Sequence, residues 1–333
     1  MANYYQPEIE TMPYEQLRQL QNERFMKQIR HVWDNVPYYR KKMEDKGVTI
    51  DDIKSVDDLH KLPFLSKDDL REAYPYGLKG MPLEDCVRIQ STSGTTGRRV
   101  VAFYTQHDID LWEDCCARAI TAVGGTKKDV CQVAYGYGLF TGGPGLNGGS
   151  HKVGCLTLPM SSGNTERQIM FIQDLNTTIL CCTPSYAAYI GETLKEQGYK
   201  PEDIPLKAGI FGAEPWTEEM RREIEKSLGI KAYDIYGLTE TSNLVSGNGE
   251  QLKKPFSVGK PYPGQQIRFV DDASHELRTP IAVIQGYVNM LDRWGKQDEK
   301  VLDESIAAIK SEAEYMNRLV EQLLFLARGD SGR

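Results

Sequence analysis

Apolar residues recur at the spacing of an α-helix through the first part of the chain. Between residues 8 and 46 they stand three or four positions apart among charged residues, which predicts helix, and Pro37 interrupts the run. A second short helical patch is expected at 51–59. A further helix is expected to begin at Ser66, a good N-cap residue with acidic residues in the turn that follows. We interpret residues 1–85 as a helical lead-in that carries no chemistry.

From residue 86 the pattern changes to short apolar runs that alternate with amphipathic stretches. The predicted strands are 86–90, 100–105, 129–134, 152–158, 178–182, 207–212 and 231–235. The predicted helices are 106–123, 164–174, 184–197 and 217–228. This alternation predicts an α/β domain, residues 86–270, with a doubly wound, mostly parallel sheet. In such sheets ligands bind at the carboxyl ends of the strands.

A third pattern occupies the end of the chain. Beyond residue 271 the apolar positions step by four and three in two runs, separated by the polar stretch 292–298. This pattern predicts a hairpin of two amphipathic helices within 271–333. One such hairpin leaves an apolar stripe exposed, so we expect two copies to pair through 271–328 into a four-helix bundle. The chain is therefore predicted to be a homodimer.

Composition narrows the function classes. The chain has 333 residues and a net charge of −7, which does not favour nucleic acid as a partner. We find no apolar run long enough to cross a bilayer and no secretory signal, so no membrane association is expected. The seven cysteines include no Cys-x-x-Cys pair. They predict reduced core thiols in a cytoplasmic protein, with a zinc site as a weaker alternative.

A loop rich in glycine and hydroxyl groups follows the first predicted strand. It reads Ser91-Thr92-Ser93-Gly94-Thr95-Thr96-Gly97-Arg98. Glycines let backbone N–H groups turn toward one point, and the hydroxyls add donors, so the loop suits the phosphates of a nucleotide. It is not a Walker loop, because the Gly-Lys-Ser/Thr ending is absent. A plain surface turn is the alternative for such composition.

Two later stretches, 211–215 and 236–240, also follow predicted strands. They read Phe211-Gly212-Ala213-Glu214-Pro215 and Tyr236-Gly237-Leu238-Thr239-Glu240. Together with the loop, in this order, they resemble the adenylate-forming enzymes, and most closely the phenylacetate–CoA ligases. The stretches at 36–40, 62–71 and 135–143 support that choice. The resemblance covers about residues 5–246.

The resemblance implies ATP-dependent activation of an aryl carboxylic acid to an acyl-adenylate, and then to a thioester of coenzyme A. It implies Mg²⁺ held by Glu240, an α-phosphate contact from Thr239, and Arg98 as a counter-charge. The implied nucleotide-binding residues are Ser91, Thr92, Ser93, Gly94, Thr95, Thr96, Gly97, Ala213, Glu214, Pro215, Tyr236 and Gly237. The alternative for 236–240 is a strand-end turn with a solvated carboxylate.

The aryl acid is expected in the glycine-dense, aromatic region 135–149. Aromatic walls, with glycines that let a flat ring approach the backbone, suit such a ligand. The predicted pocket residues are Tyr135, Gly136, Tyr137, Phe140 and Gly142. A lid or a cluster of turns is the alternative.

After Glu240 the likeness to ligases weakens. The Thr-Gly-Asp motif, the hinge and the small domain with the catalytic lysine are not found, so we expect impaired activity. From residue 274 the sequence reads Ser274-His275-Glu276-Leu277-Arg278-Thr279-Pro280, which resembles the phosphoacceptor box of sensor histidine kinases. That resemblance implies His275 as phosphoacceptor and a response regulator as a partner. A solvated helix histidine is the alternative.

Three functions remain open from the sequence. The first is an aryl-acid–CoA ligase, and the second is a dimerisation and phosphoacceptor module of two-component signalling. The third is a non-catalytic protein that binds nucleotide or aryl acid. We predict a chimera of two truncated parents joined near residues 269–272, arising by natural fusion or by an error in sequence assembly.

Overall fold

The structure describes mainly the part of the chain whose sequence resembles the ligases. The computed structural model describes residues 3–92, 99–214, 216–239, 243–247, 260–261 and 306. The chain divides into two units, 1–267 and 268–333, and the fold reported below is that of the first. The predicted hairpin in 271–333, including His275, lies outside the described residues apart from Ile306.

The N-terminal segment is helical, as predicted. Its elements are α1 (Pro7–Glu10), α2 (Tyr14–Asn35), α3 (Pro37–Asp45), η1 (Ile50–Asp52), η2 (Val56–Lys61), α4 (Lys67–Glu72) and η3 (Leu83–Asp85). Pro37 opens α3, where its missing N–H is harmless. Ser66 caps α4, since its hydroxyl accepts from the Asp69 N–H at 3.2 Å. The patch predicted as helix at 51–59 instead forms 3₁₀ helices. Capping boxes at Thr49 and Ser55 each begin a new helical segment, so neither segment extends into a longer α-helix.

The glycine-rich loop joins two strands that pair with each other. β1 (Cys86–Ser91) and β2 (Val101–Thr105) form an antiparallel two-stranded sheet of their own. In the register, Ser91 lies opposite Val101 and Ile89 lies opposite Phe103. The sequence pattern groups these strands with the parallel sheet, and the structure corrects this. The connection between them is too short for the crossover that parallel strands need.

The larger sheet is mostly parallel. Within the described residues its order is β4-β3-β5-β6-β7-β8-β9, parallel from β4 to β7 and antiparallel from β7 to β9. The strands are β3 (Val130–Val133), β4 (Leu156–Leu158), β5 (Ile179–Cys182), β6 (Ala208–Gly212), β7 (Lys231–Leu238), β8 (Asn243–Gly247) and β9 (Lys260–Pro261).

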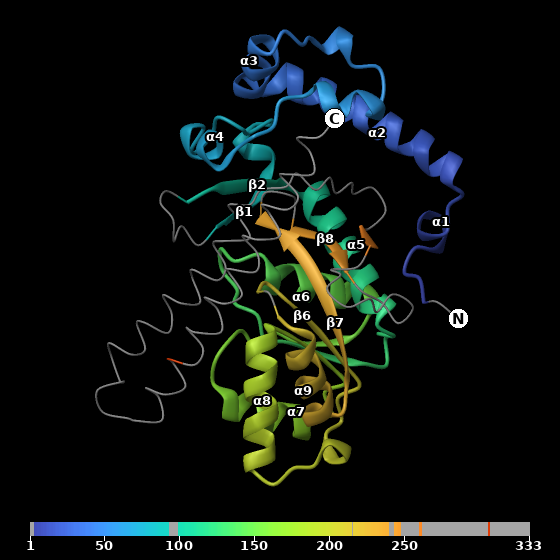
Figure 1. The fold of residues 1–333 in the computed structure, drawn as a ribbon, viewed down its shortest axis with the longest axis vertical. Coiled ribbons are helices and arrows are strands. Elements are labelled where there is room, and N and C mark those ends of the chain that lie inside the picture. Colours follow the sequence, from blue (N-terminus) through green and yellow to red (C-terminus); the bar gives the residue numbers. More distant parts are fainter. Residues whose placement is uncertain are drawn as a thin grey trace, which may run out of the picture. The chain divides into compact units, whose positions relative to one another are not determined.

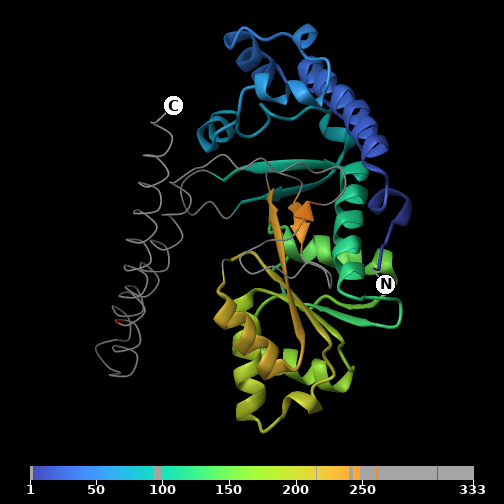
Figure 2. The ribbon, with the colours of Figure 1, turned by 45° about the vertical axis from the view of Figure 1, so that its right-hand side comes forward.

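Helices cover both faces of this sheet, which confirms the doubly wound fold (Figures 1 and 2). They are α5 (Gln106–Ala122), α6 (Gly142–Val153), α7 (Thr165–Asp174), α8 (Pro184–Glu196), η4 (Pro201–Asp203) and α9 (Glu218–Leu228). The inner strand β5 shows how the faces divide. Ile179 and Cys181 pack in the cluster that contains α5 and α6, whereas Leu180 and Cys182 pack in the cluster that contains α7, α8 and α9. Successive side chains on a strand point to opposite faces, and here both faces are buried.

Helix α6 covers the second half of the glycine-dense region 135–149, where the sequence analysis expected no helix. The glycines that suggested a loop recur at helical spacing and face α5; they are Gly145, Gly148 and Gly149. A Cβ on Gly149 would lie 2.4 Å from the Cβ of Cys116 on α5. Glycine is therefore needed for close helix–helix approach rather than for loop conformation.

The end of α6 also changes a predicted strand. The pattern predicts a strand at 152–158, but α6 continues to Val153 and Gly154 ends it with φ of +87°. This left-handed C-cap favours glycine, and the strand begins only at Leu156. At the other boundary, β7 runs to Leu238, beyond the predicted 231–235, because β8 pairs with its last four residues.

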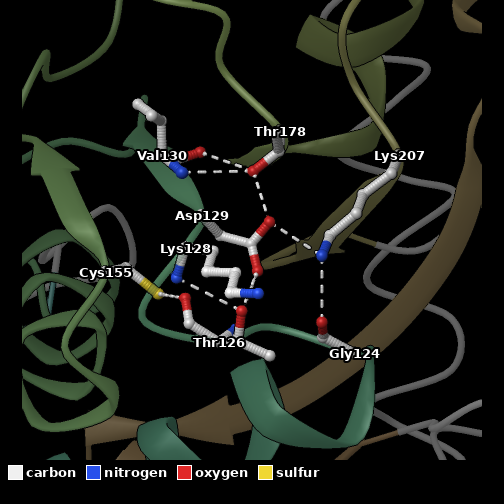
Figure 3. Close-up of polar contacts among 8 residues, drawn as sticks. All are labelled: Gly124, Thr126, Lys128, Asp129, Val130, Cys155, Thr178 and Lys207. Carbon is white, nitrogen blue, oxygen red and sulfur yellow. Dashed lines mark hydrogen bonds and ion pairs between the residues drawn. The ribbon is translucent and has the colours of Figure 1, made fainter.

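A polar cluster ties the amino ends of three strands together. Asp129, Thr178 and Lys207 directly precede β3, β5 and β6 (Figure 3). Asp129 Oδ1 lies 2.7 Å from Lys207 Nζ and accepts from Thr178 Oγ1 at 2.8 Å. Thr126 donates to the other carboxylate oxygen through its N–H and its hydroxyl, at 2.8 and 2.9 Å. Burial alone would raise the pKa of Asp129, but these partners hold it below its usual value.

The cysteines are free thiols, as predicted. Cys116, Cys131, Cys155, Cys181 and Cys182 are buried in the two core clusters. In the part of the chain that the structure describes, no helix has the length and apolar character to cross a membrane.

Candidate functional site

The predicted site residues gather at one edge of the large sheet. β3, β5, β6 and β7 are parallel neighbours, so their carboxyl ends lie side by side (Figure 1). Tyr135 follows the end of β3, Thr183 follows β5, Ala213 follows β6, and Tyr236 lies near the end of β7. The described residues of the stretches at 135–143, 211–215 and 236–240 therefore lie where open α/β sheets bind ligands.

The glycine-rich loop is closed at its base and attached to the aromatic region. The Thr92 N–H donates to the Val100 carbonyl, and the Val100 N–H donates to Thr92 Oγ1, both at 3.0 Å. The Ser91 N–H donates to the Leu139 carbonyl at 3.0 Å. The predicted phosphate-binding residues 93–98 lie outside the described residues, so their contacts stay predictions.

A buried glutamine strengthens this attachment. Only acceptors face one side of the Gln90 carboxamide, so its nitrogen is assigned to that side, where it donates to the carbonyls of Gly138 and Leu139 at 2.9 and 2.8 Å. Gly138 has φ of +76°, a left-handed conformation that glycine adopts without strain. The end of β1 thus holds the turn at Gly138 and Leu139, which directly precedes Phe140.

The aromatic residues of the predicted aryl pocket lie together but differ in exposure. Tyr135 is buried in the core, 6.3 Å from Phe140 between ring centroids, whereas Phe140 is 43% exposed. The hydroxyl of half-buried Tyr137 donates to Asn147 Oδ1 on α6 at 3.3 Å. Burial raises the pKa of both tyrosines, so their phenols stay neutral. Phe140 is therefore the ring best placed to contact a ligand, and Tyr135 supports it from the core.

The two predicted pocket glycines differ in the room around them. A Cβ on Gly136 would have no neighbour closer than 3.9 Å, so this backbone is open on that side. A Cβ on Gly142 would lie 2.6 Å from Cε1 of Phe140. Gly142 is thus needed for the observed position of the Phe140 ring.

The turn after β6 is strained and anchored. Ala213 has φ of +70°, which is rare for a residue with a Cβ and is typical of functional sites. Glu214 Oε1 accepts from the Ser185 N–H at 2.6 Å, at the start of α8. Gly212 lets β6 pack tightly on β7, since a Cβ there would lie 2.4 Å from the Ile235 carbonyl oxygen. Pro215 lies outside the described residues.

The end of β7 presents the last motif. Tyr236 is 37% exposed, so one part of its ring is available to a ligand. The carbonyl of Thr239 accepts from the Tyr104 hydroxyl at 3.4 Å, which links this motif to β2. Tyr104 in turn packs on Trp112 of α5, with 5.6 Å between ring centroids. Glu240 lies outside the described residues.

Comparison with known proteins decides the family. A family model described as "AMP-binding enzyme" matches residues 15–286, a span that includes every segment of this site. The chain belongs to the AMP-binding enzyme family. A second model, "His Kinase A (phospho-acceptor) domain", matches residues 265–332. The two matches overlap across the predicted junction at 269–272, and the chimeric interpretation fits both.

Curated relatives repeat this division. Phenylacetate-coenzyme A ligase of Pseudomonas putida is 48% identical over 232 residues, covering 70% of this chain and 53% of the relative. The signal transduction histidine-protein kinase ArlS of Staphylococcus epidermidis is 44% identical over 89 residues, covering 27% of this chain and 19% of the kinase. The chain therefore spans about half the length of the ligases that it matches.

Solved structures agree with the fold. A 2-hydroxyisobutyryl-CoA ligase in complex with 2-HIB-AMP and CoA superposes with a TM-score of 0.71 and 26% identity. The match covers 78% of this chain and 56% of the ligase.

Asp234 is a partly buried carboxylate close to the Tyr236 motif, and sequence analysis did not single it out. It lies two residues before Tyr236, and residues two apart on a strand share a face, so this spacing could have revealed it. Burial raises the pKa of Asp234 to about 6, against the opposing influence of the Trp216 indole and the Arg221 guanidinium. Arg221 also stacks on Trp216, 4.3 Å from the ring centroid. A carboxyl group with a raised pKa is a candidate for function when it lies near other candidate site residues, as Asp234 lies near Tyr236.

The described residues contain no group of three or more His, Cys, Asp or Glu side chains that could hold a metal ion. Magnesium is commonly bound by only one or two carboxylates together with substrate phosphates. The predicted ligand Glu240 follows directly on Thr239, so a carboxylate and a hydroxyl stand next to each other in sequence. This oxygen donor set has the chemistry that Mg²⁺ prefers.

Proposed function

We propose that the AMP-binding part of the chain activates an aryl carboxylic acid of the phenylacetate class with ATP. The observation that carries the proposal is the 48% identity with a phenylacetate-coenzyme A ligase over 70% of this chain. The site supports it, since loops from four parallel strands converge where such sheets bind ligands. Coenzyme A is the proposed acceptor of the activated acyl group.

The chemistry needs charge neutralisation and positioning more than covalent help. A carboxylate oxygen attacks the α-phosphorus of ATP and pyrophosphate leaves. The thiol of coenzyme A then attacks the acyl carbon and AMP leaves. In our proposal the loop 91–98 binds the β- and γ-phosphates, Thr239 donates to the α-phosphate, and Tyr236 stacks on adenine. Glu240 is the proposed ligand of Mg²⁺, which would neutralise phosphate charge when bound.

The acid is proposed to bind against Phe140. The exposed ring of Phe140 lies between the turn that Gln90 anchors and Gly142. The open backbone at Gly136 leaves room for a flat group beside it. Aromatic rings prefer offset or edge-to-face contacts with one another. An exposed phenylalanine ring therefore favours an aryl acid over a short aliphatic one.

The test is phenylacetate-dependent exchange of radiolabelled pyrophosphate into ATP, measured with the full chain. We expect exchange above the rate without acid, and loss of that increment in Glu240→Gln. Glu202→Gln, an exposed carboxylate on η4, is the matched control and should leave exchange unchanged. Saturable ATP binding without exchange would favour a non-catalytic binding protein instead.

A second function is supported by a separate observation. The phosphoacceptor family model matches 265–332, and this span contains the box around His275. We propose that His275 accepts a phosphoryl group from an intact histidine kinase and passes it to the aspartate of a response regulator. Two copies would pair through 271–328.

The test is transfer of labelled phosphate from an intact kinase of this family to the chain. We expect phosphate that is labile to acid and stable to base, as a phosphohistidine is, and its absence in His275→Gln. His151→Gln, on the last turn of α6, is the control and should still be labelled. Labelling that persists in His275→Gln would rule out this function.

A further inference from the structure

The loop between β4 and α7, residues 159–164, contains a serine in a strained backbone conformation. We call it the serine loop. Ser161, Gly163 and Asn164 have φ of +62°, +86° and +51°, all in the left-handed region. Glycine adopts this conformation readily, and Asn164 caps α7, since its Oδ1 accepts from the Arg167 N–H at 3.3 Å. Ser161 caps none of the described helices. A strained residue that its surroundings hold in place is typical of functional sites.

A buried polar network holds the serine loop in this conformation. The side chain of Gln168 on α7 donates to the carbonyls of Ser161 and Gly163, at 2.7 and 3.2 Å. Its Oε1 accepts from Gln132 Nε2 on β3 at 2.6 Å, and Gln132 Oε1 accepts from the Thr177 hydroxyl at 3.1 Å. Both glutamines and the threonine are fully buried. The hydrogen bonds therefore run in one direction, from Thr177 through the glutamines to the loop carbonyls.

Such a network fixes position more than it adds stability. A hydrogen bond gains little over the bond to water that it replaces, whereas a buried group without a partner is costly, so every member must stay in place. The serine loop is also tied to the carboxyl end of β3, because the Ser161 N–H donates to the carbonyl of Val133 at 3.2 Å. The next residue, Ser162, is therefore held at the edge of the sheet where ligands bind.

The hydroxyl of Ser162 lies beside the proposed acid site. A Cβ built on Gly136 would lie 4.0 Å from Ser162 Oγ and 3.9 Å from Cδ1 of Phe140. The space next to the Gly136 backbone therefore borders both a hydroxyl group and an aromatic ring. An aryl group in that space would contact the ring of Phe140 and bring a ring substituent within reach of Ser162. Sequence analysis did not single out this serine, because it lies far along the chain from the aromatic region.

We propose that Ser162 is a specificity-determining residue and that the acid it selects carries a hydroxyl group on its aromatic ring. A serine hydroxyl both donates and accepts, as a phenol hydroxyl does, so the two groups can pair with either one as donor. Ligand pockets commonly set orientation and specificity with a few placed polar groups among apolar walls. The inference rests on the proposed function for the place where the acid binds, but it is tested by binding without catalysis.

The experiment measures the affinity of the full chain for five acids by isothermal titration calorimetry with AMP present. They are phenylacetate, meta- and para-hydroxyphenylacetate, and the two methylphenylacetates in which a methyl group of similar size replaces the hydroxyl. We expect at least one hydroxy acid to bind about three- to tenfold more tightly than its methyl counterpart, as one hydrogen bond would give.

Variants assign this preference to the serine. Ser162→Ala should abolish it and leave the affinity for the methyl counterpart unchanged, whereas Ser162→Thr keeps a hydroxyl and should retain it. Ser162 is exposed, so its replacement leaves the core intact, and circular dichroism verifies the fold. Thr193→Ala removes a hydroxyl near the end of α8 and is the control, which should bind all five acids as the unchanged chain does.

Each outcome decides the proposal. Equal affinities for hydroxy and methyl acids, a preference that survives Ser162→Ala, or no binding of any acid overturns it. A variant Ser162→Ala that weakens all five acids alike assigns the serine to the carboxylate and likewise overturns the proposal. A preference that is lost in Ser162→Ala alone supports it. If that preference is found but no acid promotes pyrophosphate exchange, this inference stands and the proposed enzymatic function fails. Exchange with phenylacetate and no preference would give the opposite result.

Discussion

Asp234 gives the sharpest test of how the site is built, because its environment opposes its charge. It lies on β7 in the same strand face as Tyr236, with Trp216 and Arg221 as neighbours. Burial raises its pKa to about 6, from an ordinary value of 3.8. The perturbation is Asp234→Asn, which keeps the shape of the side chain and removes the charge.

The magnitude follows from linkage between protonation and folding. The folded state holds the Asp234 proton more tightly than the unfolded state, so ionisation weakens folding as the pH rises from about 4 to about 6. At about 1.4 kcal/mol per pKa unit, the difference between 6 and 3.8 corresponds to about 3 kcal/mol above that range. Asp234→Asn should therefore stabilise the protein by about 3 kcal/mol at neutral pH and by about 1 kcal/mol near pH 4.5.

The assay is urea denaturation followed by circular dichroism at pH 7.5 and pH 4.5, with the full chain in every case. The quantity compared is the free energy of unfolding of Asp234→Asn relative to the unchanged protein. Asp174→Asn, an exposed carboxylate at the end of α7, is the control and should change stability little at either pH. Equal slopes of the denaturation curves would show that the two proteins unfold alike.

Two results would refute the reasoning. The first is a change in stability that is the same at both pH values, which would mean that the charge of Asp234 is not opposed in the folded protein. It could also destabilise more at pH 7.5 than at pH 4.5, which would mean that the carboxylate is stabilised by Arg221. A stabilised variant with poorer ATP binding would instead show that the site keeps this carboxylate at the expense of stability.

Three further predictions concern other parts of the molecule. Asp129→Asn should lower the free energy of unfolding by about 2 kcal/mol at pH 7. Because the pKa of Asp129 is lowered in the folded state, this loss should shrink as the pH falls below about 4; an equal loss at pH 3 in urea denaturation would contradict it. Gly149→Ala should cost about 1–3 kcal/mol through overpacking against α5, and an unchanged melting temperature would contradict this. Gly142→Ala should displace Phe140, raising the KM for phenylacetate in the exchange assay but not that for ATP; equal changes in both would argue against an aryl pocket.

Much of the fold was predictable because local sequence patterns determine its strands and helices. Short apolar runs flanked by turn residues predicted β3, β5 and β6 closely, since strands buried on both faces need near-continuous apolar sequence. Capping residues predicted helix starts, as Thr217 does for α9 by accepting the Met220 N–H at 3.2 Å. The same pattern placed the motifs at 211–215 and 236–240 at the ends of strands, and the structure has their first residues in the last positions of β6 and β7.

The failures have a common physical cause. Glycine carries no local signal that separates a loop from a tightly packed helix, so the sequence analysis expected no helix where α6 lies. Likewise, a strand-like run of residues does not indicate which other strand it pairs with. β1 and β2 resemble members of the large sheet, yet they pair with each other because the connection between them is short.

By itself the sequence determined the α/β class, most of the strands and helices of the large sheet, the family resemblance and the motifs that carry the proposed chemistry. Only the tertiary structure decided which of those motif residues present a surface to a ligand. It exposed Phe140 and Tyr236, buried Tyr135, and raised the pKa of Asp234. Exposure and pKa depend on neighbours that are distant in sequence, because burial and charge act through space rather than along the chain.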